Sequence, residues 1–315
     1  MSEQRNDGPG APTRGRHAIR SADRAPAPGS GGPIAVIGQE ELQATSAAAS
    51  PRRNILREAM PPAMVFILFL LAWAGYRTFV LDRFKRRIVP LPWTVLQKGF
   101  TTAGASKKNP SELITGVKIT TQVAVTGLVI ATTVGVMLAV LMSTRKWVEN
   151  SVYPYAVALQ TIPIIAIAPI INIILGSGLG ARIFTCVVIS IFPIIINTLF
   201  GLKSADAGQH DLFTLHDAGF FTRLFKLQFP AALPSMFEGF RISAGLSVIG
   251  AIVGEFFFSQ GPRGLGILID IYKSRGLYNA LFAAIILSSM LGLVVFFAVT
   301  WLRKIVIGRW YQAAR

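Results

Sequence analysis

The sequence contains few of the residue types that build most metal and redox centres. Among its 315 residues there is one cysteine, Cys186, and the three histidines are His17, His210 and His216. One cysteine cannot form a disulfide within the chain, and no second group of ligands accompanies the histidines. We therefore expect neither a metal ion nor another cofactor.

Charged residues are also scarce. They make up 15% of the chain, with 31 basic against 15 acidic residues, whereas hydrophobic residues reach 52% and the mean hydropathy is +0.53. This balance indicates a membrane protein, because several apolar runs reach the roughly 18 to 20 residues that a helix needs to cross a bilayer. We expect six spans, at residues 59–76, 119–143, 150–181, 183–202, 242–261 and 276–302.

Large apolar residues are nearly missing from the first 50 positions, which are rich in Gly, Pro, Ala, Ser and Arg. Such a segment cannot form a core, so we expect a disordered tail at 1–55. The first span and an outer loop then occupy 56–112, a membrane core occupies 113–303, and a second tail occupies 304–315.

The net charge of +16 lies in the tail and at the edges of the spans. Basic residues there are typical of anchors at lipid headgroups rather than of a face that binds nucleic acid. Short basic loops favour the cytoplasm, which places both termini and the segment 203–241 inside. The basic loop 83–87 disagrees with this rule, because it follows the first span and faces outward.

The third span contains three prolines, Pro154, Pro163 and Pro169, and each removes a backbone donor. We expect a kinked helix, which borders a pathway more often than lipid, although a kink can also serve packing alone. Polar residues of the third to fifth spans are candidates for the same pathway or for bonds between helices: Gln160, Thr161, Asn172, Asn197 and Glu255. For Glu255 the alternative is a place near the outer surface, where its side chain reaches water.

The longest polar connection, 203–229, carries apolar residues at spacings of three and four, which predict short amphipathic helices. They either rest on headgroups or dock a soluble partner. The stretch FPAALPSMFEGFRIS follows. Pro230 and Pro234 are expected to end the cytoplasmic helix and set the angle of the next span, while Glu238 and Arg241 share one helix face at the water boundary.

At these residues the sequence resembles the permease subunits of bacterial type I ABC importers. Their coupling helix has the motif Glu-Ala-Ala, three residues, Gly, nine residues, Ile-x-Leu-Pro. Here LQFP, Leu227 to Pro230, matches the end of the motif. Strict spacing places Asp211 at the Glu, Leu212 and Phe213 at the alanines and Asp217 at the Gly, and the nearest glycine is Gly219.

Three further stretches resemble the branch that imports nitrate, alkanesulfonates, taurine and thiamine or flavin precursors. They are LQTIPIIAIAPIINIILGSGLG, FPIIINTLFGL and FPAALPSMFEGFRISAGLSVIGAIVGEFF followed by GPRGLGILI. The resemblance covers residues 113–302. It implies an all-α membrane protein with about six transmembrane helices, the type I importer permease fold and a coupling helix near 208–226, in the plasma membrane of a bacterium.

The resemblance also implies partners. A second copy of the permease, two cytoplasmic ATPases and an extracytoplasmic substrate-binding protein would complete the transporter, which would import a small anionic or heterocyclic solute. The chain lacks a G-x-x-x-x-G-K-[ST] phosphate loop, so ATP hydrolysis is expected in the partner and no enzymatic activity in this chain. The alternative is a channel or carrier that is not coupled to ATP.

The resemblance assigns the docking of the ATPase to one set of residues, whereas the prolines and polar side chains of the apolar spans predict the translocation pathway. Within the docking segment, the carboxylates at 211 and 217 are expected to cap helix N-termini or to bind an Arg of the partner. The docking residues are Asp211, Leu212, Phe213, Asp217, Gly219, Phe220, Leu227, Pro230 and Pro234. The pathway residues are Gln160, Thr161, Pro163, Pro169, Asn172, Asn197 and Glu255.

Overall fold

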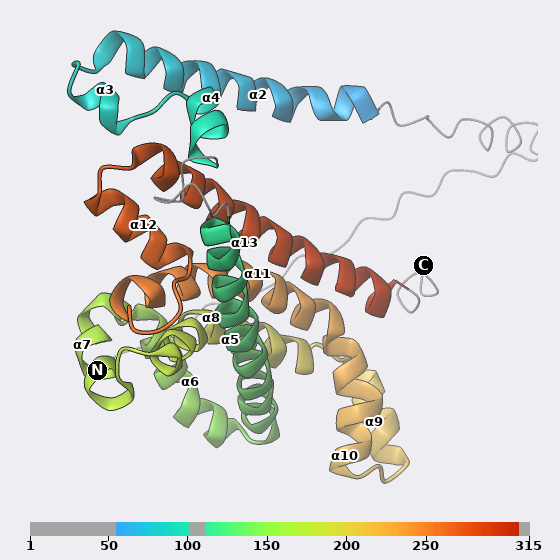
Figure 1. Ribbon diagram of the computed structural model, residues 1–315. Helices are drawn as coiled ribbons and strands as arrows, with labels where there is room; N and C mark the ends of the chain where they lie inside the picture. Colours follow the sequence, from blue (N-terminus) through green and yellow to red (C-terminus); the bar gives the residue numbers. More distant parts are fainter. Residues whose placement is uncertain (1–54, 101–110, 309–315) are drawn as a thin grey trace, which may run out of the picture. The chain divides into compact units, whose positions relative to one another are not determined.

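The fold was analysed in a computed structural model, which describes residues 55–100 and 111–308; the predicted tails therefore lie outside the described residues, apart from their inner ends. The chain divides into two compact units, Met1–Ala63 and Met64–Arg315, and helix α2 (Ile55–Gly75) begins in the first and ends in the second. Every regular element in the described ranges is helical (Figure 1).

Five described segments are long and apolar enough to cross a membrane, and a bent pair of helices raises the number to six. This confirms the predicted all-α fold. The spans are Met60–Val80, Glu112–Thr144, Leu179–Leu202, Phe220–Phe257 and Tyr278–Ile307, and the bent pair is Lys146–Thr161 with Ile164–Leu175. Besides α2, the longer helices within them are α5 (Ser111–Thr144), α6 (Lys146–Thr161), α7 (Ile164–Leu175), α8 (Leu179–Leu202), α11 (Phe229–Phe257) and α13 (Tyr278–Ile307).

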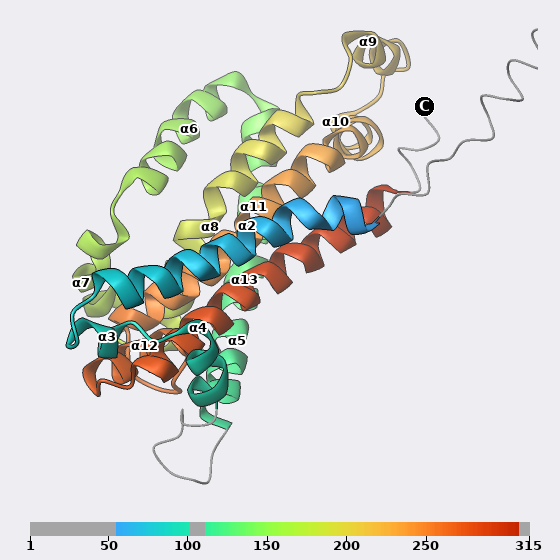
Figure 2. The same ribbon diagram turned by 90° about the horizontal axis from the view of Figure 1, so that it is seen from above.

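The long helices of the second unit bring distant parts of the chain together at two ends. Helix α8 runs parallel to α5 and antiparallel to α11, and α13 is in turn antiparallel to α11 (Figures 1 and 2). The α12 end therefore holds the starts of α5, α8 and α13, the end of α11, and helix α12 (Leu265–Ser274). The α9 end holds the opposite termini of these helices with α9 (Ala207–Leu215) and α10 (Phe220–Arg223).

Four short helices lead from α2 to α5 at the α12 end. They are η1 (Tyr76–Val80, a π-helix), α3 (Lys85–Ile88), α4 (Pro92–Thr94) and η2 (Val95–Gly99, also π). Two arginines satisfy backbone carbonyls of this irregular stretch. Arg77 Nε donates to Val89 O at 2.7 Å, and Arg86 donates to Leu81 O at 2.8 Å and to Thr78 O at 2.6 Å. Arg86, one of the basic residues in the loop 83–87 that disagrees with the orientation rule, therefore stabilises the backbone of this stretch.

The backbones of α8 and α11 come into contact because glycines lie between them and carry no side chain. A Cβ on Gly250 would lie 2.8 Å from the Cα of Cys186, and one on Gly254 would lie 3.0 Å from the Cα of Arg182. Near the α9 end, Gly201 of α8 meets the backbone of Ala232 in the same way. Small residues at such contacts are the usual means by which membrane helices approach closely, since lipid supplies no hydrophobic force between them.

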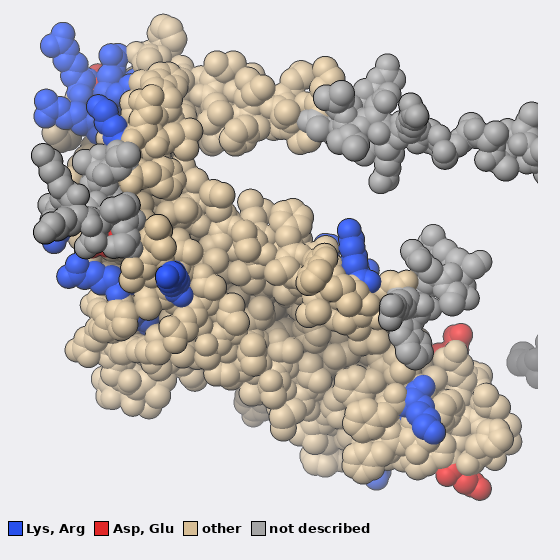
Figure 3. Space-filling view, turned by 45° about the vertical axis from the view of Figure 1, so that its right-hand side comes forward, with Lys and Arg blue, Asp and Glu red and all other residues tan. Residues whose placement is uncertain are grey.

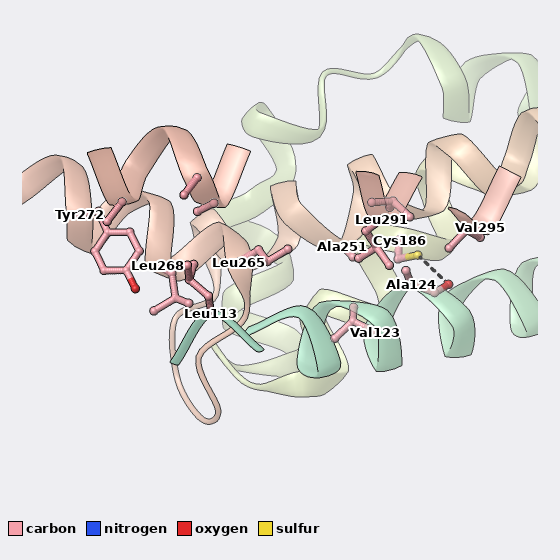
Figure 4. Close-up of a cluster of buried hydrophobic side chains, with 14 of the residues drawn as sticks. Leu113, Val123, Ala124, Cys186, Ala251, Leu265, Leu268, Tyr272, Leu291 and Val295 are labelled. Carbon is pink, nitrogen blue, oxygen red and sulfur yellow. Dashed lines mark hydrogen bonds between the residues drawn. The ribbon is translucent and has the colours of Figure 1, made fainter. Parts of the chain in front are cut away.

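The largest buried cluster joins α5, α8, α11, α12 and α13 around Cys186, which is fully buried (Figure 4). The Cys186 thiol donates to Ser247 O at 3.2 Å, and the dashed line in Figure 4 marks its contact with Ala124 O at 3.8 Å. Leu265 and Leu268 of α12 belong to the same cluster, so the short helix packs into the same core as the long ones. The core thereby fixes the position of the α12 end.

The close packing of α8 against α11 yields a test within one helix. Gly250→Ala should destabilise the protein by about 1–3 kcal/mol, because the added methyl group has no space against α8. Gly245→Ala is the matched control, since nothing lies within 4 Å of a Cβ at that position. Thermal unfolding of both variants in detergent would measure the difference. Equal midpoints for the two variants would contradict this packing.

Candidate functional site

The span formed by α6 and α7 is broken. The two helices meet at an angle of 101°, and both residues of the break, Ile162 and Pro163, have extended backbone. Proline lacks an N–H and disfavours a helical conformation of the residue before it, which explains why the helix stops there. Pro154 and Pro169 lie inside α6 and α7. The predicted kink is confirmed, and only one of the three prolines produces the break.

A small pocket of about 260 Å³ lies beside this break. Gln160 and Ile162 line it from the break, Phe192 and Pro193 from α8, and Leu246 from α11. Thr161 and Pro163 are exposed at the break without lining the pocket. The pocket therefore contains one polar pathway candidate, Gln160, and the pathway candidates Thr161 and Pro163 lie next to it.

The remaining polar candidates bond locally. Thr161 Oγ1 donates to Ala158 O at 2.9 Å, and Asn197 Nδ2 donates to Pro193 O at 2.8 Å, both within their own helices. Asn172 is exposed and accepts a bond of 2.6 Å from Ser177 in the turn after α7. Gly176 ends α7 with a φ of +72°, so the glycine-rich segment before α8 forms a tight turn. None of these three hydrogen bonds joins separate spans.

Glu255 is fully buried near the end of α11, so its carboxylate does not reach water. It accepts bonds from Thr120 Oγ1 at 2.9 Å and from the backbone N–H of Gly266 at 2.7 Å. Thr120 Oγ1 in turn accepts the N–H of Leu265 at 2.8 Å. These groups satisfy the first N–H groups of α12, where a negative charge also complements the helix dipole. The structure thus places Glu255 at the start of α12 and away from the pocket at the helix break.

Arg182 completes this arrangement, although it is not among the site residues that the sequence predicts. Its guanidinium is fully buried and donates to three carbonyls of the loop between α11 and α12: Phe258 at 2.7 Å, Gln260 at 2.6 Å and Pro262 at 2.8 Å. An arginine between two apolar tracts was the available signal. Its place between the predicted spans 150–181 and 183–202 indicates a boundary, whereas the residue is part of α8.

The surroundings of α12 carry a further polar contact. Tyr272 OH donates to Glu112 Oε2 at 3.3 Å, and Arg263 Nη1 lies 3.7 Å from the other oxygen of the same carboxylate. Burial raises the pKa of the Tyr272 hydroxyl, so the group stays protonated and remains a donor. Among the described residues, no three His, Cys, Asp or Glu side chains come together as a metal site would require.

At the opposite end, α9 finishes in a Schellman motif. The N–H of Ala218 donates to Phe213 O and the N–H of Asp217 donates to Thr214 O, both at 3.0 Å. Asp217 has a φ of +47°, and among the described residues it is the one non-glycine residue with a positive φ. Arg223 Nε holds the turn by donating to Ala218 O at 2.8 Å. Two short helices with a fixed turn therefore occupy the predicted polar connection.

The predicted capping roles of the two aspartates are wrong. Asp206 is at the N-cap of α9, Asp211 lies within that helix, and Asp217 follows its C-terminus. Gly219 is the N-cap of α10. A capping role for Asp211 requires a helix that begins after this residue, whereas α9 begins at Ala207.

The prediction that Pro230 and Pro234 end the helix before the fifth span is also wrong. Residues 220–257 form one continuous helical run, in which a π-helical turn, η3 (Leu224–Gln228), precedes Pro230 at the start of α11. The N–H of Phe229 donates to Leu224 O across five residues. A wider turn accommodates the proline ring and its missing donor, so the helix continues instead of ending.

Apolar side chains around this turn are unusually exposed. Leu215 is 82% exposed, Phe221 is 71% exposed and Leu212 is 53% exposed. Phe220, Phe225 and Phe229 line a groove of about 620 Å³ against the last turns of α5, whereas Leu224 and Leu227 are buried. Phe213 is half-buried. Exposed apolar patches of this kind mark surfaces that bind a partner or lipid.

The charged pair that follows is confirmed and enlarged by a third residue. Arg241 lies 2.8 Å from Glu238 on one face of α11, and Arg303 of α13 lies 3.5 Å from the other oxygen of Glu238. The Arg241 guanidinium is also 5.1 Å from the centroid of the Phe296 ring. These contacts tie α13 to α11 close to the α9 end.

Residues 131–307 match the family described as the binding-protein-dependent transport system inner membrane component. The formylaminopyrimidine transport permease protein ThiX of Halalkalibacterium halodurans is 31% identical over 255 residues, which is 79% of this chain and 96% of the relative. The nitrate import permease protein NrtB of Synechocystis is 30% identical over 188 residues, 59% of this chain and 67% of the relative. The riboflavin transport system permease protein RibX of Chloroflexus aurantiacus is 32% identical over 167 residues, which is 52% of this chain and 60% of the relative.

The bonds at the start of α12 yield a matched pair of variants. Thr120→Val should destabilise the protein by about 1–3 kcal/mol, because it leaves a buried carboxylate oxygen and the Leu265 N–H without their shared partner. Thr120→Ser keeps the hydroxyl and should lose less. Unfolding of both variants in detergent would measure the effect. A loss for Ser as large as that for Val would show that the methyl group and not the hydroxyl matters.

Proposed function

Because this chain belongs to the family of binding-protein-dependent transport system inner membrane components, we propose that the segment from α9 to η3 couples it to an ATPase. The chain is a permease subunit of an ABC importer. Hydrolysis would occur in the partner, and the permease would convert the motion of the ATPase into the opening of a path for the solute.

The observation that carries this proposal is the backbone of Asp217. Strict spacing from LQFP puts this residue where the coupling motif has glycine, and its φ of +47° lies in the region that glycine adopts most readily. Gly219, the alternative match, has a φ of −66° and needs no glycine for its backbone. The geometry thus supports the register that begins at Asp211, in spite of the different side chains.

The exposure of the same segment supports a protein partner. The apolar residues Leu212 and Leu215 project from α9 without cover from the described chain, and α9 has no lipid-spanning length. A few such residues, buried on docking, supply most of the affinity at protein interfaces. We therefore assign Leu212, Phe213, Leu215 and Phe220 to the contact with the ATPase.

This assignment orients the molecule. The α9 end would face the cytoplasm together with both termini, and the α12 end would face outward, in the plasma membrane of a bacterium. The family supports a multi-pass inner membrane protein, and the basic residues Arg145, Lys146 and Lys203 near the α9 end agree with this orientation.

We propose the α6–α7 break as the border of the translocation path. A broken helix leaves backbone groups that only a polar cavity or protein can satisfy, and a pocket with Gln160 in its otherwise apolar lining lies beside the break. The relatives are named for formylaminopyrimidine, riboflavin and nitrate transport, so the solute would be a small heterocycle or anion. A second copy of the chain would form the other wall of the path.

The coupling role predicts the effect of aromatic truncations. Phe213→Ala and Phe220→Ala should each weaken association with the ATPase by about 2 kcal/mol, roughly thirtyfold, and reduce substrate-stimulated hydrolysis. Phe256→Ala, at an exposed phenylalanine near the other end of α11, is the control and should change neither. Asp217→Gly should preserve coupling, because glycine suits the backbone there. Co-elution of purified complexes and ATP hydrolysis would be measured.

Full association and stimulation in both aromatic variants would contradict the docking role. The α9 segment would then be an interfacial helix resting on headgroups, and the channel or carrier alternative would gain support.

The orientation is tested by labelling. Single cysteines at Gln209 and Ser259 are both exposed, whereas the native Cys186 is buried and should not react. A membrane-impermeant maleimide added to cells with a permeabilised outer boundary and a sealed plasma membrane should label position 259 and not position 209. Labelling of 209 alone would reverse the orientation.

A further inference from the structure

An apolar groove lies on the surface of two membrane spans. It has a volume of about 540 Å³ and is lined mainly by α11 and α13. It shares no residue with the pocket at the helix break. Among its lining residues, Val248 and Ser288 are buried, whereas Ile249 and Leu293 are exposed. Because both helices are long and apolar enough to cross a membrane, a soluble protein cannot reach this groove.

Two glycines keep the groove open. Nothing lies within 4 Å of a Cβ built on Gly245 of α11 or on Gly292 of α13. Glycine is less favourable than alanine within a helix, and in membranes close contact between helices is its usual purpose. Gly250 serves that purpose against α8, whereas Gly245 and Gly292 make no such contact within the described chain. The space beside them therefore suits a molecule outside this chain.

The groove has the polarity and the length for a hydrocarbon chain. Its two serine hydroxyls are satisfied within α13, because Ser288 donates to Ala284 O at 2.8 Å and Ser289 donates to Ile285 O at 3.1 Å. From residue 285 to residue 296 the axis of α13 rises by about 16 Å, at roughly 1.5 Å per residue. This length is close to half of the roughly 30 Å that the hydrocarbon of a bilayer measures. One acyl chain of one leaflet would therefore fit along it.

Two arginines stand where the groove ends toward α9. The Arg241 guanidinium lies 5.1 Å from the centroid of the Phe296 ring, which lines the groove. Arg241 and Arg303 share one carboxylate, that of Glu238, at 2.8 and 3.5 Å, so the cluster carries an excess positive charge. Its side chains are 34 to 38% exposed and stay accessible to a ligand. In the view of Figure 3, charged side chains lie mostly toward the two ends, and most of the surface between them carries none.

We propose that this groove binds an acyl chain of an anionic phospholipid, whose phosphate binds to Arg241 and Arg303. Arginine forms paired hydrogen bonds with phosphate, and basic pockets between membrane helices suit anionic headgroups. The excess positive charge favours a lipid of single negative charge, such as phosphatidylglycerol, over zwitterionic phosphatidylcholine. The bound lipid fills the space beside the two glycines and joins α11 to α13.

This site is independent of the coupling role, since it requires only that α11 and α13 cross a membrane. A helix from a second copy of the chain is the competing occupant, because small residues also admit close helix contacts. An apolar helix would leave the excess charge at Arg241 and Arg303 without a partner, which is why the lipid is favoured.

The test uses the full-length chain in detergent, with phosphatidylglycerol and phosphatidylcholine of identical acyl chains as probes. Native mass spectrometry would measure the affinity for the first bound lipid. The wild type should prefer phosphatidylglycerol roughly tenfold, and Arg241→Gln/Arg303→Gln should lose this preference. Gly292→Leu fills the groove and keeps both arginines, so it should weaken the binding of both lipids roughly fivefold. Phosphatidylglycerol should raise the unfolding midpoint of the wild type and not that of Gly292→Leu.

Two control variants match these changes. Lys273→Gln/Arg275→Gln removes two exposed cations at the end of α12, and Gly180→Leu adds the same side chain to α8 where a Cβ also has open space. Both should bind lipid like the wild type.

An unchanged preference in the double arginine variant would overturn the proposal, as would unchanged lipid binding in Gly292→Leu. The leucine variant retains the ion cluster, so its loss of lipid could not come from a broken ion pair. If Gly292→Leu kept its lipids and lost a dimeric state seen for the wild type, the groove would belong to a second copy and the lipid site would be refuted.

Discussion

Direct contact between the backbones of α8 and α11 is the constraint on which the rest of the structure depends. Lipid gives membrane helices no hydrophobic reason to associate, so their contact relies on close packing and on polar groups that find partners. Gly250 and Gly254 allow that contact near the α12 end, and Gly201 allows it near the α9 end. Two helices fixed along their length can carry a displacement from one end of the molecule to the other.

The two ends of the helix pair α8 and α11 differ in the interactions that stabilise them. At the α12 end, Arg182 from α8 and Glu255 from α11 bury charge to hold a loop and a helix start, which is costly unless every group is bonded. At the α9 end, the turn after α9 leaves apolar side chains open and relies on backbone geometry at Asp217. Between the ends, the break at Pro163 interrupts the backbone hydrogen bonds of a membrane span.

Composition and run lengths predicted the fold well, because crossing a bilayer demands apolar helices of known length. The break at a proline followed from local patterns as well, and so did the short helices of the polar connection 203–229. Three details could not be read from the sequence. The burial of Arg182 depends on carbonyls contributed by a loop some eighty residues away. The place of Glu255 depends on Thr120 of another helix. The continuity through Pro230 depends on a π-helical turn that no local pattern announces.

The central claim is that the α9 segment touches the ATPase. Leu215 is 82% exposed and Cys186 is buried. In the variant Leu215→Cys, a thiol reagent should therefore react with position 215 and not with Cys186. A photoactivatable crosslinker attached there in the assembled transporter should join the permease to the ATPase, and the yield should change when ATP binds. The same crosslinker at Lys273, on the α12 end, should not reach the ATPase. Crosslinks from position 273 and none from position 215 would contradict the account.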